Sequence, residues 1–295
     1  MIASFTAHKP LLFGIAYRML GSVAEADDMV QETWLRWQRQ NEAEVQSPKA
    51  WLVSAITRLC IDQLRSARRT REEYYGVWLP EPLVESSEPS PQESAALADS
   101  LGMAFMLMLE SLNPVERAVF LLREVFDYDY PDIARIVGTS EANCRQIVRR
   151  AKASLPKTTE PAATPPDARA KEVVQRFLAA AKSGNVQDLL AVLTDDATLY
   201  TDGGGRVTAT GRPIVSADHV SRFFAGISRK TTKASPEVQL TRINGQAGAL
   251  ILHNGRVDRT MVFELRGDRV AAIYMVRNPD KLQHVPNPPE RPPLS

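Results

Sequence analysis

The chain has 295 residues, of which 44% are hydrophobic and 24% are charged, a composition typical of a globular protein with two or three domains. Its formal net charge of +1 does not by itself indicate nucleic-acid binding. No apolar run reaches the roughly 20 residues that a membrane helix needs, and no signal peptide is visible, so we expect a cytoplasmic protein without a membrane partner. Cys60 and Cys144 show neither metal-ligand spacing nor the density of a disulfide scaffold, so we expect no metal and no cofactor.

Two proline-rich stretches divide the chain. The first contains four prolines among acidic residues and serines, and the second reads PKTTEPAATPP. Both compositions are typical of extended linkers. The predicted divisions are domains at 1–75, 96–155 and 168–285, linkers at 76–95 and 156–167, and a proline-rich tail at 286–295.

The first domain is predicted to be helical. Apolar residues from Ala26 to Trp37 recur at spacings of three and four, which is one face of an amphipathic helix. Ser47 and Pro48 then supply an N-cap and a first-turn proline for a second helix. The residues expected to be buried on this second helix are Leu52, Ala55, Ile56, Leu59 and Cys60.

The second of these helices carries a basic stripe opposite its apolar face. Arg58, Arg65 and Arg69 lie on the stripe, and Arg68 flanks it. Such a stripe suits a phosphate backbone, because each bound cation displaces a counterion. Trp51, earlier on the same helix, could stack on an unpaired base. The alternative interpretation is an ordinary solvated charged face with a tryptophan in the core.

The second domain is also predicted to be helical. Asn113 and Pro114 begin the first of three helices, and the other two span 130–137 and 141–155. A tight turn at 138–140, which contains a glycine, joins the last two. Two helices joined in this way, the second one basic, predict a helix-turn-helix.

Polar and basic residues dominate the exposed surface of the last of these helices, while Ile147, Val148 and Ala151 are expected to face the core. Arginine pairs with guanine, and glutamine or asparagine with adenine, at base edges in the major groove. The alternative interpretation is an ordinary basic helix. The residues expected to contact duplex DNA are Ser140, Asn143, Arg145, Gln146, Arg149 and Arg150.

The third domain is predicted to be α+β. Asn254–Gly255 and Gly267–Asp268 are hairpin signals. The pattern favours helices packed on one curved antiparallel sheet. The expected helices are 168–183, 186–193 and 215–226, and the expected strands are 238–243, 247–253, 256–265 and 269–276.

Arg259 shares an apolar face of the third expected strand. A buried cation is costly unless it is paired, so Arg259 could mark a pocket, with Asp202 as a conceivable partner. Tyr200 and His253 could also line the cavity. The alternative is a purely structural Arg–Asp pair, with the glycines after Asp202 forming a turn of positive φ. No acid–base pair at catalytic spacing is visible, so we expect no catalytic residues.

Three segments lie in order within residues 1–155: DDMVQETWLRW, SPKAWLVSAITRLCIDQLRSARR and NPVERAVFLLREVFDYDYPDIARIVGTSEANCRQIVRRAKASL. This ordered set resembles the extracytoplasmic-function (group four) sigma factors of bacterial RNA polymerase. The resemblance implies an alternative sigma factor whose partners are the clamp and flap of core RNA polymerase and promoter DNA, both as duplex and as melted single strand. These proteins have a linker in place of the middle sigma domain.

The resemblance also implies a role for each helical segment. The acidic and aromatic helix would dock on the polymerase through Asp28, Gln31, Glu32 and Trp34. The helix at 50–71 would open and read the −10 element through Trp51, Arg58, Arg65, Arg68 and Arg69. The helix at 141–152 would read the −35 element through the six residues expected to contact duplex DNA. Capturing a flipped base costs a few kcal/mol of unstacking, which an apolar pocket beside cations could offset.

Residues 168–285 resemble the SnoaL-like, nuclear-transport-factor-like fold, a cone-shaped sheet with a pocket that could take an unknown small ligand. The motifs WLPEP, DGGGR and NPDKL are similar to those of a sub-group of these sigma factors with this domain at the C-terminus. In that sub-group the domain is thought to act as a built-in regulator. Because the domain is tethered to the sigma domains, its effective concentration is high, and weak contacts are enough for it to bind them. The expected regulatory interface is Trp78, Leu79, Pro80, Glu81, Pro82, Asp202, Gly203, Gly204, Gly205, Arg206, Asn278, Pro279 and Asp280.

The expected fold is therefore multidomain: two all-α sigma domains, the second a helix-turn-helix, followed by an α+β SnoaL-like domain. The expected function is that of a sigma factor modulated in cis, and not of an enzyme. Two alternatives stay open. The chain could be a SnoaL-like hydrolase, cyclase or isomerase with a regulatory helical half, or a ligand-sensing helix-turn-helix regulator that binds duplex DNA unaided. The clamp-like helix at 24–38 argues against both.

Overall fold

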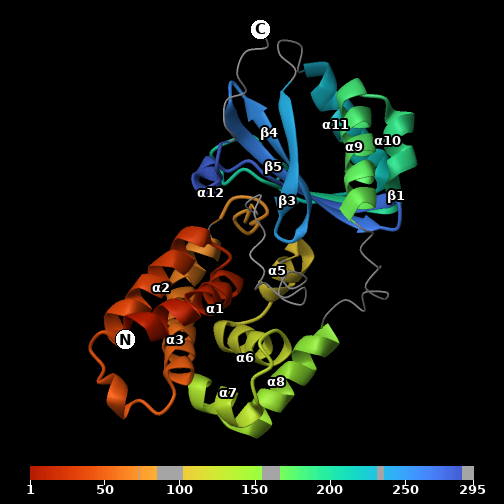
Figure 1. Ribbon diagram of the computed structural model, residues 1–295. Helices are drawn as coiled ribbons and strands as arrows, with labels where there is room; N and C mark the ends of the chain where they lie inside the picture. The colour runs from red at the N-terminus through yellow and green to blue at the C-terminus, as the bar shows by residue number, and fades with distance from the viewer. Residues whose placement is uncertain (73, 85–101, 155–166, 231–235, 288–295) are drawn as a thin grey trace. The chain divides into compact units, whose positions relative to one another are not determined.

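The computed structural model describes residues 1–72, 74–84, 102–154, 167–230 and 236–287. The chain forms two compact units, an N-terminal helical one and a C-terminal one that contains a sheet (Figure 1). The N-terminal unit comprises residues 1–73 and 94–157, and the C-terminal unit comprises residues 74–93 and 158–295. The segment that contains WLPEP therefore belongs to the C-terminal unit.

The first part of the N-terminal unit consists of α1 (Ile2–Leu20), α2 (Val23–Trp37), a short 3-10 helix (Glu42–Glu44) and α3 (Pro48–Glu72). Gly21 ends α1 in the left-handed conformation, with φ of 68°. The Ser22 hydroxyl caps α2 by accepting a hydrogen bond from the Glu25 amide at 3.2 Å. The helices α2 and α3 confirm the predicted pair, whereas α1 was not predicted.

The second part of this unit consists of α5 (Met103–Leu109), α6 (Pro114–Glu124), α7 (Tyr130–Val137) and α8 (Glu141–Ser154). A capping box between Asn113 and Glu116 begins α6. Gly138, with φ of 72°, ends α7 and leads into α8. The predicted helix-turn-helix is therefore present, preceded by α5, which the sequence analysis did not predict.

The two parts of the N-terminal unit pack on each other through α1, α3, α6 and α7. Arg117 of α6 is only 3% exposed. Its Nη1 donates to the Met19 carbonyl of α1 at 2.6 Å and lies 2.9 Å from Oε1 of Glu110. Because a buried cation without partners is strongly destabilising, these contacts hold α6 against α1.

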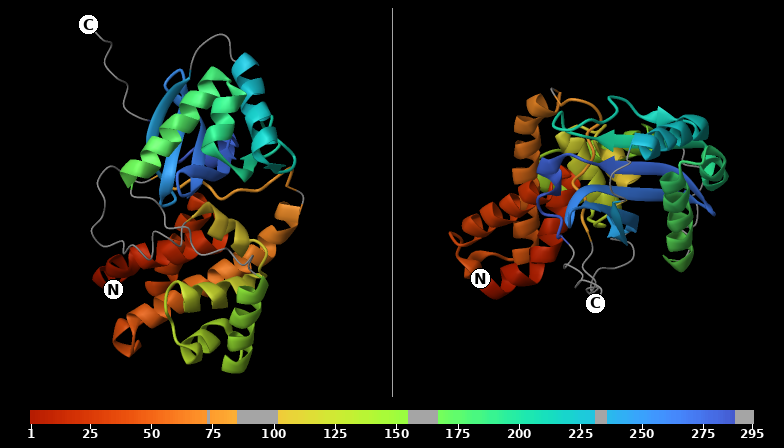
Figure 2. Two further views of the ribbon diagram at one scale, coloured as in Figure 1. Left: turned by 90° about the vertical axis from the view of Figure 1, so that its right-hand side faces the viewer. Right: turned by 90° about the horizontal axis from the view of Figure 1, so that it is seen from above.

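The C-terminal unit is α+β, as predicted. The helices α9 (Asp167–Ser183), α10 (Val186–Val192) and α11 (Ala217–Lys230) cover one face of the sheet (Figures 1 and 2). A short helix, α12 (Pro279–Leu282), follows the last strand. The strands are β1 (Leu193–Asp202), β2 (Ile214–Val215), β3 (Glu237–Ile243), β4 (Gln246–His253), β5 (Arg256–Arg266) and β6 (Arg269–Val276).

The sheet is mixed, so the prediction of an antiparallel sheet was wrong in one respect. Its strand order is β2-β1-β6-β5-β4-β3, and β1 runs parallel to β6 with Asp202 opposite Val276. The chain leaves β1, passes through α11 and three hairpin-connected strands, and returns beside β1 in the same direction. Because parallel neighbours end at the same edge of a sheet, the segments that follow β1 and β6 lie side by side.

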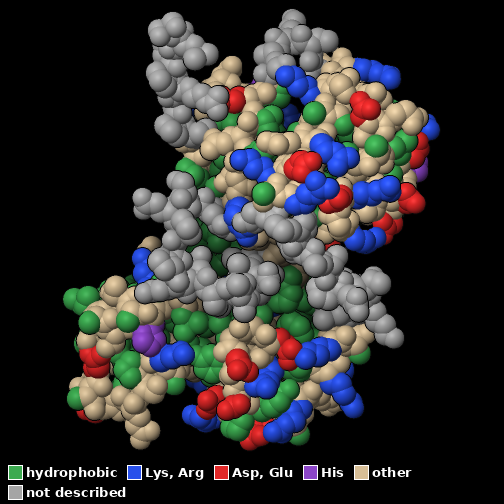
Figure 3. All heavy atoms as spheres, turned by 45° about the vertical axis from the view of Figure 1, so that its right-hand side comes forward, with side chains coloured by type: hydrophobic (Ala, Val, Ile, Leu, Met, Phe, Trp, Pro, Cys, Tyr) green, Lys and Arg blue, Asp and Glu red, His purple; other side chains and the backbone are tan. Residues whose placement is uncertain are grey.

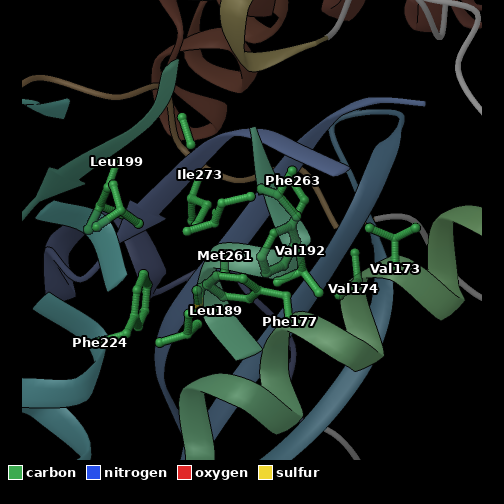
Figure 4. Packing of buried hydrophobic residues seen from close by; sticks show 14 of the residues in the cluster. Val173, Val174, Phe177, Leu189, Val192, Leu199, Phe224, Met261, Phe263 and Ile273 are labelled. Atoms are coloured by element: carbon green, nitrogen blue, oxygen red, sulfur yellow. The ribbon is translucent and has the colours of Figure 1, made fainter. Parts of the chain in front are cut away.

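The core of this unit lies between the helices and the sheet. The ring of Phe177 on α9 meets Phe224 of α11 at 5.0 Å and Phe263 of β5 at 5.4 Å between centroids, both edge-on (Figure 4). Fully burying one such side chain contributes about 1.5–3 kcal/mol. This shared core fixes the three helices over the concave face of the sheet.

Candidate functional site

Helix α8 has one apolar and one basic face. Ser140 Oγ caps it by accepting from the Asn143 amide at 3.2 Å. Cys144, Ile147 and Val148 are buried on the side that packs against α6 and α7. Figure 3 shows basic side chains, with acidic ones among them, over the part of the N-terminal unit where α7 and α8 lie. The exposed predicted residues on α8 are Arg145, Gln146, Arg149 and Arg150.

The basic residues of α8 differ in how they are held. Arg145 Nη2 lies 3.1 Å from Oε2 of Glu141, and Arg150 Nη2 lies 3.5 Å from Oε1 of Glu116. Arg149 is exposed and has no partner among the residues that the structure describes. Since exposed ion pairs are weak, all three guanidinium groups are accessible to an anionic partner, and Arg149 is the least restrained.

Arg58 of α3 joins the predicted −10 helix to the helix-turn-helix. Its Nε donates to the Ile136 carbonyl at 2.9 Å, and its Nη2 donates to the Arg135 carbonyl at 3.0 Å. Both carbonyls belong to the last turn of α7, where helix carbonyls lack partners within the helix. In this arrangement Arg58 is therefore occupied within the N-terminal unit.

Of the remaining arginines of the α3 stripe, the structure describes the side chain of Arg65. Arg65 is exposed and lies 3.5 Å from Asp62. The ring of Trp51 is half-buried and tilted against Trp37 at 5.2 Å between centroids. The side chains of two further predicted residues lie outside the described part of the chain: Arg68 and Arg69.

The predicted polymerase-binding residues lie on the outer side of α2. Asp28 and Gln31 are exposed. Glu32 pairs with Arg36 one turn later at 2.9 Å, and half-buried Trp34 packs against α1. The helix thus exposes acidic and amide side chains on its outer side, while the aromatic ring of Trp34 packs against α1.

Asp202 stands at the centre of a buried polar cluster in the C-terminal unit. Its side chain is 0% exposed. Oδ1 accepts from the Tyr74 hydroxyl at 2.5 Å and from the Gly204 amide at 3.0 Å, and Oδ2 accepts from the Leu79 amide and from Lys281 Nζ, each at 2.8 Å. Four donors, one of them the Lys281 cation, offset the large cost of burying a carboxylate.

Lys281 closes this cluster from the opposite side. Its side chain is 8% exposed, and its Nζ donates to the Leu79 carbonyl as well as to Asp202. The ammonium also lies 4.1 Å from the ring centroid of Trp78 and 4.9 Å from that of Tyr74, two cation–π contacts. Burial, and secondly the hydrogen bond to Asp202, raise the pKa of Tyr74, so its hydroxyl keeps the proton that it donates.

The DGGGR and NPDKL motifs meet because they follow two parallel strands. The Asp202 carbonyl accepts from the Asn278 amide at 3.0 Å, and Asn278 Nδ2 donates to the Tyr74 hydroxyl at 3.0 Å. Gly204 has φ of 59°, and a Cβ there would lie 2.2 Å from Asn278 Nδ2. Glycine is therefore required at this position. Outside the cluster, Arg206 and Asp280 form an exposed pair at 3.3 Å.

The segment after Leu79 is held at three more points. Leu83 exchanges two hydrogen bonds with Asn244, at 2.8 and 3.0 Å, and Val84 forms an isolated antiparallel bridge with Ile243. The Pro82 carbonyl lies 2.9 Å from His284 Nε2. Residues 74–84 therefore lie along the C-terminal unit over their whole length.

The structure separates the two charges that were suggested as partners, Arg259 and Asp202. Asp202 pairs with Lys281, whereas Arg259 Nε lies 2.9 Å from Oδ2 of the adjacent Asp258. That expectation was wrong because the strand register has a bulge at Asp258, which brings two successive side chains together. Arg259 does line a pocket, but the other two residues suggested for it are not among its lining: Tyr200, which stacks on Tyr274, and His253.

Tyr74 and Lys281 were missed as site residues. Lys281 lies within NPDKL and is the cation opposite the acid of DGGGR, so charge complementarity could have identified it. Tyr74 lies two positions before the predicted linker at 76–95, within the predicted first domain, and no sequence signal marks it. Asn244 occupies a hairpin turn with φ of 53°, and its contact with Leu83 depends wholly on tertiary structure.

Two kinds of feature are absent from the described residues. None of their helices is both long and apolar enough to cross a bilayer. Nor do they contain three or more His, Cys, Asp or Glu side chains grouped as metal ligands. Cys60 and Cys144 are both buried and free, and burial raises the pKa of each thiol.

Comparison with known proteins assigns the chain to one family. The family model described as Sigma-70 region 2 matches residues 5–70, and the one described as Sigma-70, region 4 matches residues 102–155. The chain is 34% identical to the ECF RNA polymerase sigma factor SigJ of Mycobacterium tuberculosis, over 97% of this chain and 94% of SigJ. It is 29% identical to the probable ECF RNA polymerase sigma factor SigI of the same organism, over 95% of this chain and 94% of SigI.

The structural comparison agrees. The crystal structure of M. tuberculosis SigJ matches with a TM-score of 0.78 and 31% identity, over 98% of this chain and all of that chain. The resemblance inferred from the ordered helical segments is thereby confirmed. The chain belongs to the ECF RNA polymerase sigma factors, and it carries a C-terminal domain like that of SigJ.

Proposed function

We propose that this sigma factor is held in a resting state by its own C-terminal unit, through the Asp202 cluster (Tyr74, Trp78, Leu79, Asp202, Asn278 and Lys281). One observation carries the proposal: a fully buried carboxylate holds residues 74–79, which precede it by 123 positions or more. In the sequence these residues lie between the two sigma domains. Holding them restricts how far the two domains can separate, because a tether of fewer free residues has a shorter reach.

The contact made by Arg58 supports the same resting state. A residue proposed to contact the −10 element instead donates to two α7 carbonyls. Polymerase and promoter binding would replace these contacts, because −10 and −35 DNA need the two sigma domains apart. In this proposal α3 opens and reads −10 DNA, α8 reads −35 DNA and α2 docks on core polymerase, all in the cytoplasm.

Run-off transcription with core polymerase tests the regulatory proposal. The full chain is expected to support transcription from its own promoter, and Lys281→Met is expected to raise it, because the Leu79 segment loses its cation. Lys171→Met is the matched control, since Lys171 is an exposed lysine on α9 of the same unit and lies outside the cluster. Equal transcription by the Lys281→Met variant and the control would refute cis regulation by this cluster.

The docking role of α2 predicts a loss of polymerase affinity on charge reversal. Asp28→Lys with Glu32→Lys should weaken binding to core polymerase while leaving the fold intact, because both side chains lie on the outer face of the helix. Co-precipitation with core polymerase measures the effect, and circular dichroism checks the fold. Asp62→Lys, on exposed α3 surface, serves as the control. Unchanged affinity in the double variant would count against α2.

The reading role of α8 predicts that Arg149→Ala weakens promoter recognition by about 1–3 kcal/mol if the guanidinium binds one guanine through two hydrogen bonds. The measurement is holoenzyme affinity for the promoter and for single-base variants of its −35 element. Loss confined to one base pair indicates base reading, and equal loss on all sequences indicates a phosphate contact. If neither Arg149→Ala nor Arg145→Ala alters transcription, α8 is not the recognition helix.

In this proposal the C-terminal domain is a regulator and not an enzyme. Asp202, its most enclosed acid, is saturated by four donors and so is poorly suited to transfer protons. A second role for the domain is the uptake of a small molecule. The observation that favours it is a pocket of about 420 Å³, a volume within the range of small-molecule sites.

A further inference from the structure

The pocket lies between α9, α11 and the inner face of the sheet, close to the core shown in Figure 4. Most of its lining is apolar and comes from both layers. Helical side chains enclose one side, and strand side chains enclose the other. The largest apolar side chains in the lining are Leu178, Phe224, Ile227, Ile251, Met261 and Met275.

The charged lining is cationic. Arg259 reaches the pocket from β5 with a side chain that is 15% exposed, and Lys182 reaches it from α9. Neither Asp nor Glu lines the pocket within the part of the chain that the structure describes. A buried cation is costly unless its charge is compensated. The degree to which the charge of Arg259 is compensated therefore determines which ligand charge the pocket prefers.

The charge of Arg259 is only partly compensated. Asp258 lies 2.9 Å from Arg259 Nε, but the same carboxylate also lies 3.8 Å from Arg277 Nη2. Two guanidinium groups thus share one carboxylate. Among the described residues, Arg259 Nε and Asp258 Oδ2 also lack a well-directed hydrogen bond. The wall of the pocket therefore carries a positive charge that Asp258 compensates only in part.

We infer that this pocket binds a small amphipathic anion, a carboxylate or sulfonate with an apolar ring or chain. Arg259 pairs with the anionic group, because a guanidinium matches such oxygens with two parallel hydrogen bonds. Lys182 adds positive charge at the pocket, and the methionines and Phe224 pack on the apolar body. The inference rests on the proposal that the pocket takes up a small molecule, and it adds the chemical class.

Fluorescence titration of the full chain tests this with two probes of similar shape. The first is 1-anilinonaphthalene-8-sulfonate, which is anionic, and the second is N-phenyl-1-naphthylamine, which is uncharged. Arg259→Met is expected to weaken sulfonate binding at least about tenfold, as loss of a charged hydrogen bond does, and to leave binding of the uncharged probe within about twofold. Arg259→Lys should recover only part of the sulfonate affinity, because lysine keeps the positive charge but cannot form the two parallel hydrogen bonds.

Pocket-filling variants distinguish binding of small molecules in this pocket from the preference of the pocket for anions. Ala181→Trp, with Ala179→Trp as a second version, should block both probes, since both alanines line the pocket. Circular dichroism confirms that each variant folds, and Lys182→Met gives a second charge variant outside the core. Equal weakening of both probes by Arg259→Met and no effect of Lys182→Met would overturn the anion preference but leave a small-molecule pocket. Binding that survives both tryptophan variants, or no binding to the unaltered chain, would overturn the pocket itself.

Discussion

Asp202→Ala is expected to lower the free energy of unfolding of the C-terminal unit by about 3–5 kcal/mol, the range found when one partner of a buried ion pair is removed. The substitution leaves Lys281 8% exposed without its carboxylate. It also leaves the Leu79 amide and the Tyr74 hydroxyl without their acceptor. Urea unfolding followed by hydrogen exchange of the β1 and β6 amides measures the loss in this unit alone.

Two further variants show whether the loss comes from the buried charge. Asp280→Ala removes an exposed acid that directly precedes Lys281 and pairs with exposed Arg206, and it should cost less than about 1 kcal/mol. Replacing both partners, with Asp202→Leu and Lys281→Met, should recover a large part of the loss, because no uncompensated charge remains. If Asp202→Ala costs no more than Asp280→Ala, the ion pair does not hold this unit together.

Trp78→Ala and Asp202→Ala are each expected to raise transcription from a matched promoter, and the double variant is expected to raise it by less than the product of the two effects. Both substitutions break one interface, since the Lys281 ammonium lies 4.1 Å from the Trp78 ring and 2.8 Å from Asp202. Residues that share partners typically couple by about 0.5–3 kcal/mol. Run-off transcription with core polymerase is measured for the unaltered chain, the two single variants and the double variant.

One result of this double-mutant cycle would contradict the resting-state proposal. If the two effects multiply fully, Trp78 and Asp202 act at separate places and the resting-state proposal fails. Trp51→Ala in place of Trp78→Ala is a useful comparison, because Trp51 belongs to the N-terminal unit and contacts Trp37. Its effect on transcription should multiply with that of Asp202→Ala.

Local sequence signals predicted those helices whose ends are marked by capping residues, prolines or glycines. Pro131 and Gly138 bound α7, and Asn113 with Pro114 begins α6 at the expected residue. The helix α1 was missed because its apolar residues do not follow one narrow stripe and Pro10 lies within it. The short α5, MAFMLML, has almost no polar residue to show a helical period.

Contacts between distant segments were harder to predict. The three motifs of the expected regulatory interface came from the resemblance to a sub-group of sigma factors, and the structure places Leu79, Asp202 and Asn278 within one cluster. Which cation meets Asp202 depends on the parallel pairing of β1 with β6, and no local pattern encodes a pairing across the whole domain. The bulge that turns Arg259 toward Asp258 is likewise a property of strand register.

The parallel pairing of β1 with β6 also has a consequence for synthesis of the protein on the ribosome. The two sigma domains and residues 74–84 are translated first, whereas Lys281 follows Leu79 by 202 positions. Domains generally fold in the order in which they leave the ribosome. The contacts of the Asp202 cluster can therefore form only after the last strand and α12 have been made. If these contacts hold the resting state as proposed, every newly made molecule passes through an interval in which its sigma domains are folded and unrestrained.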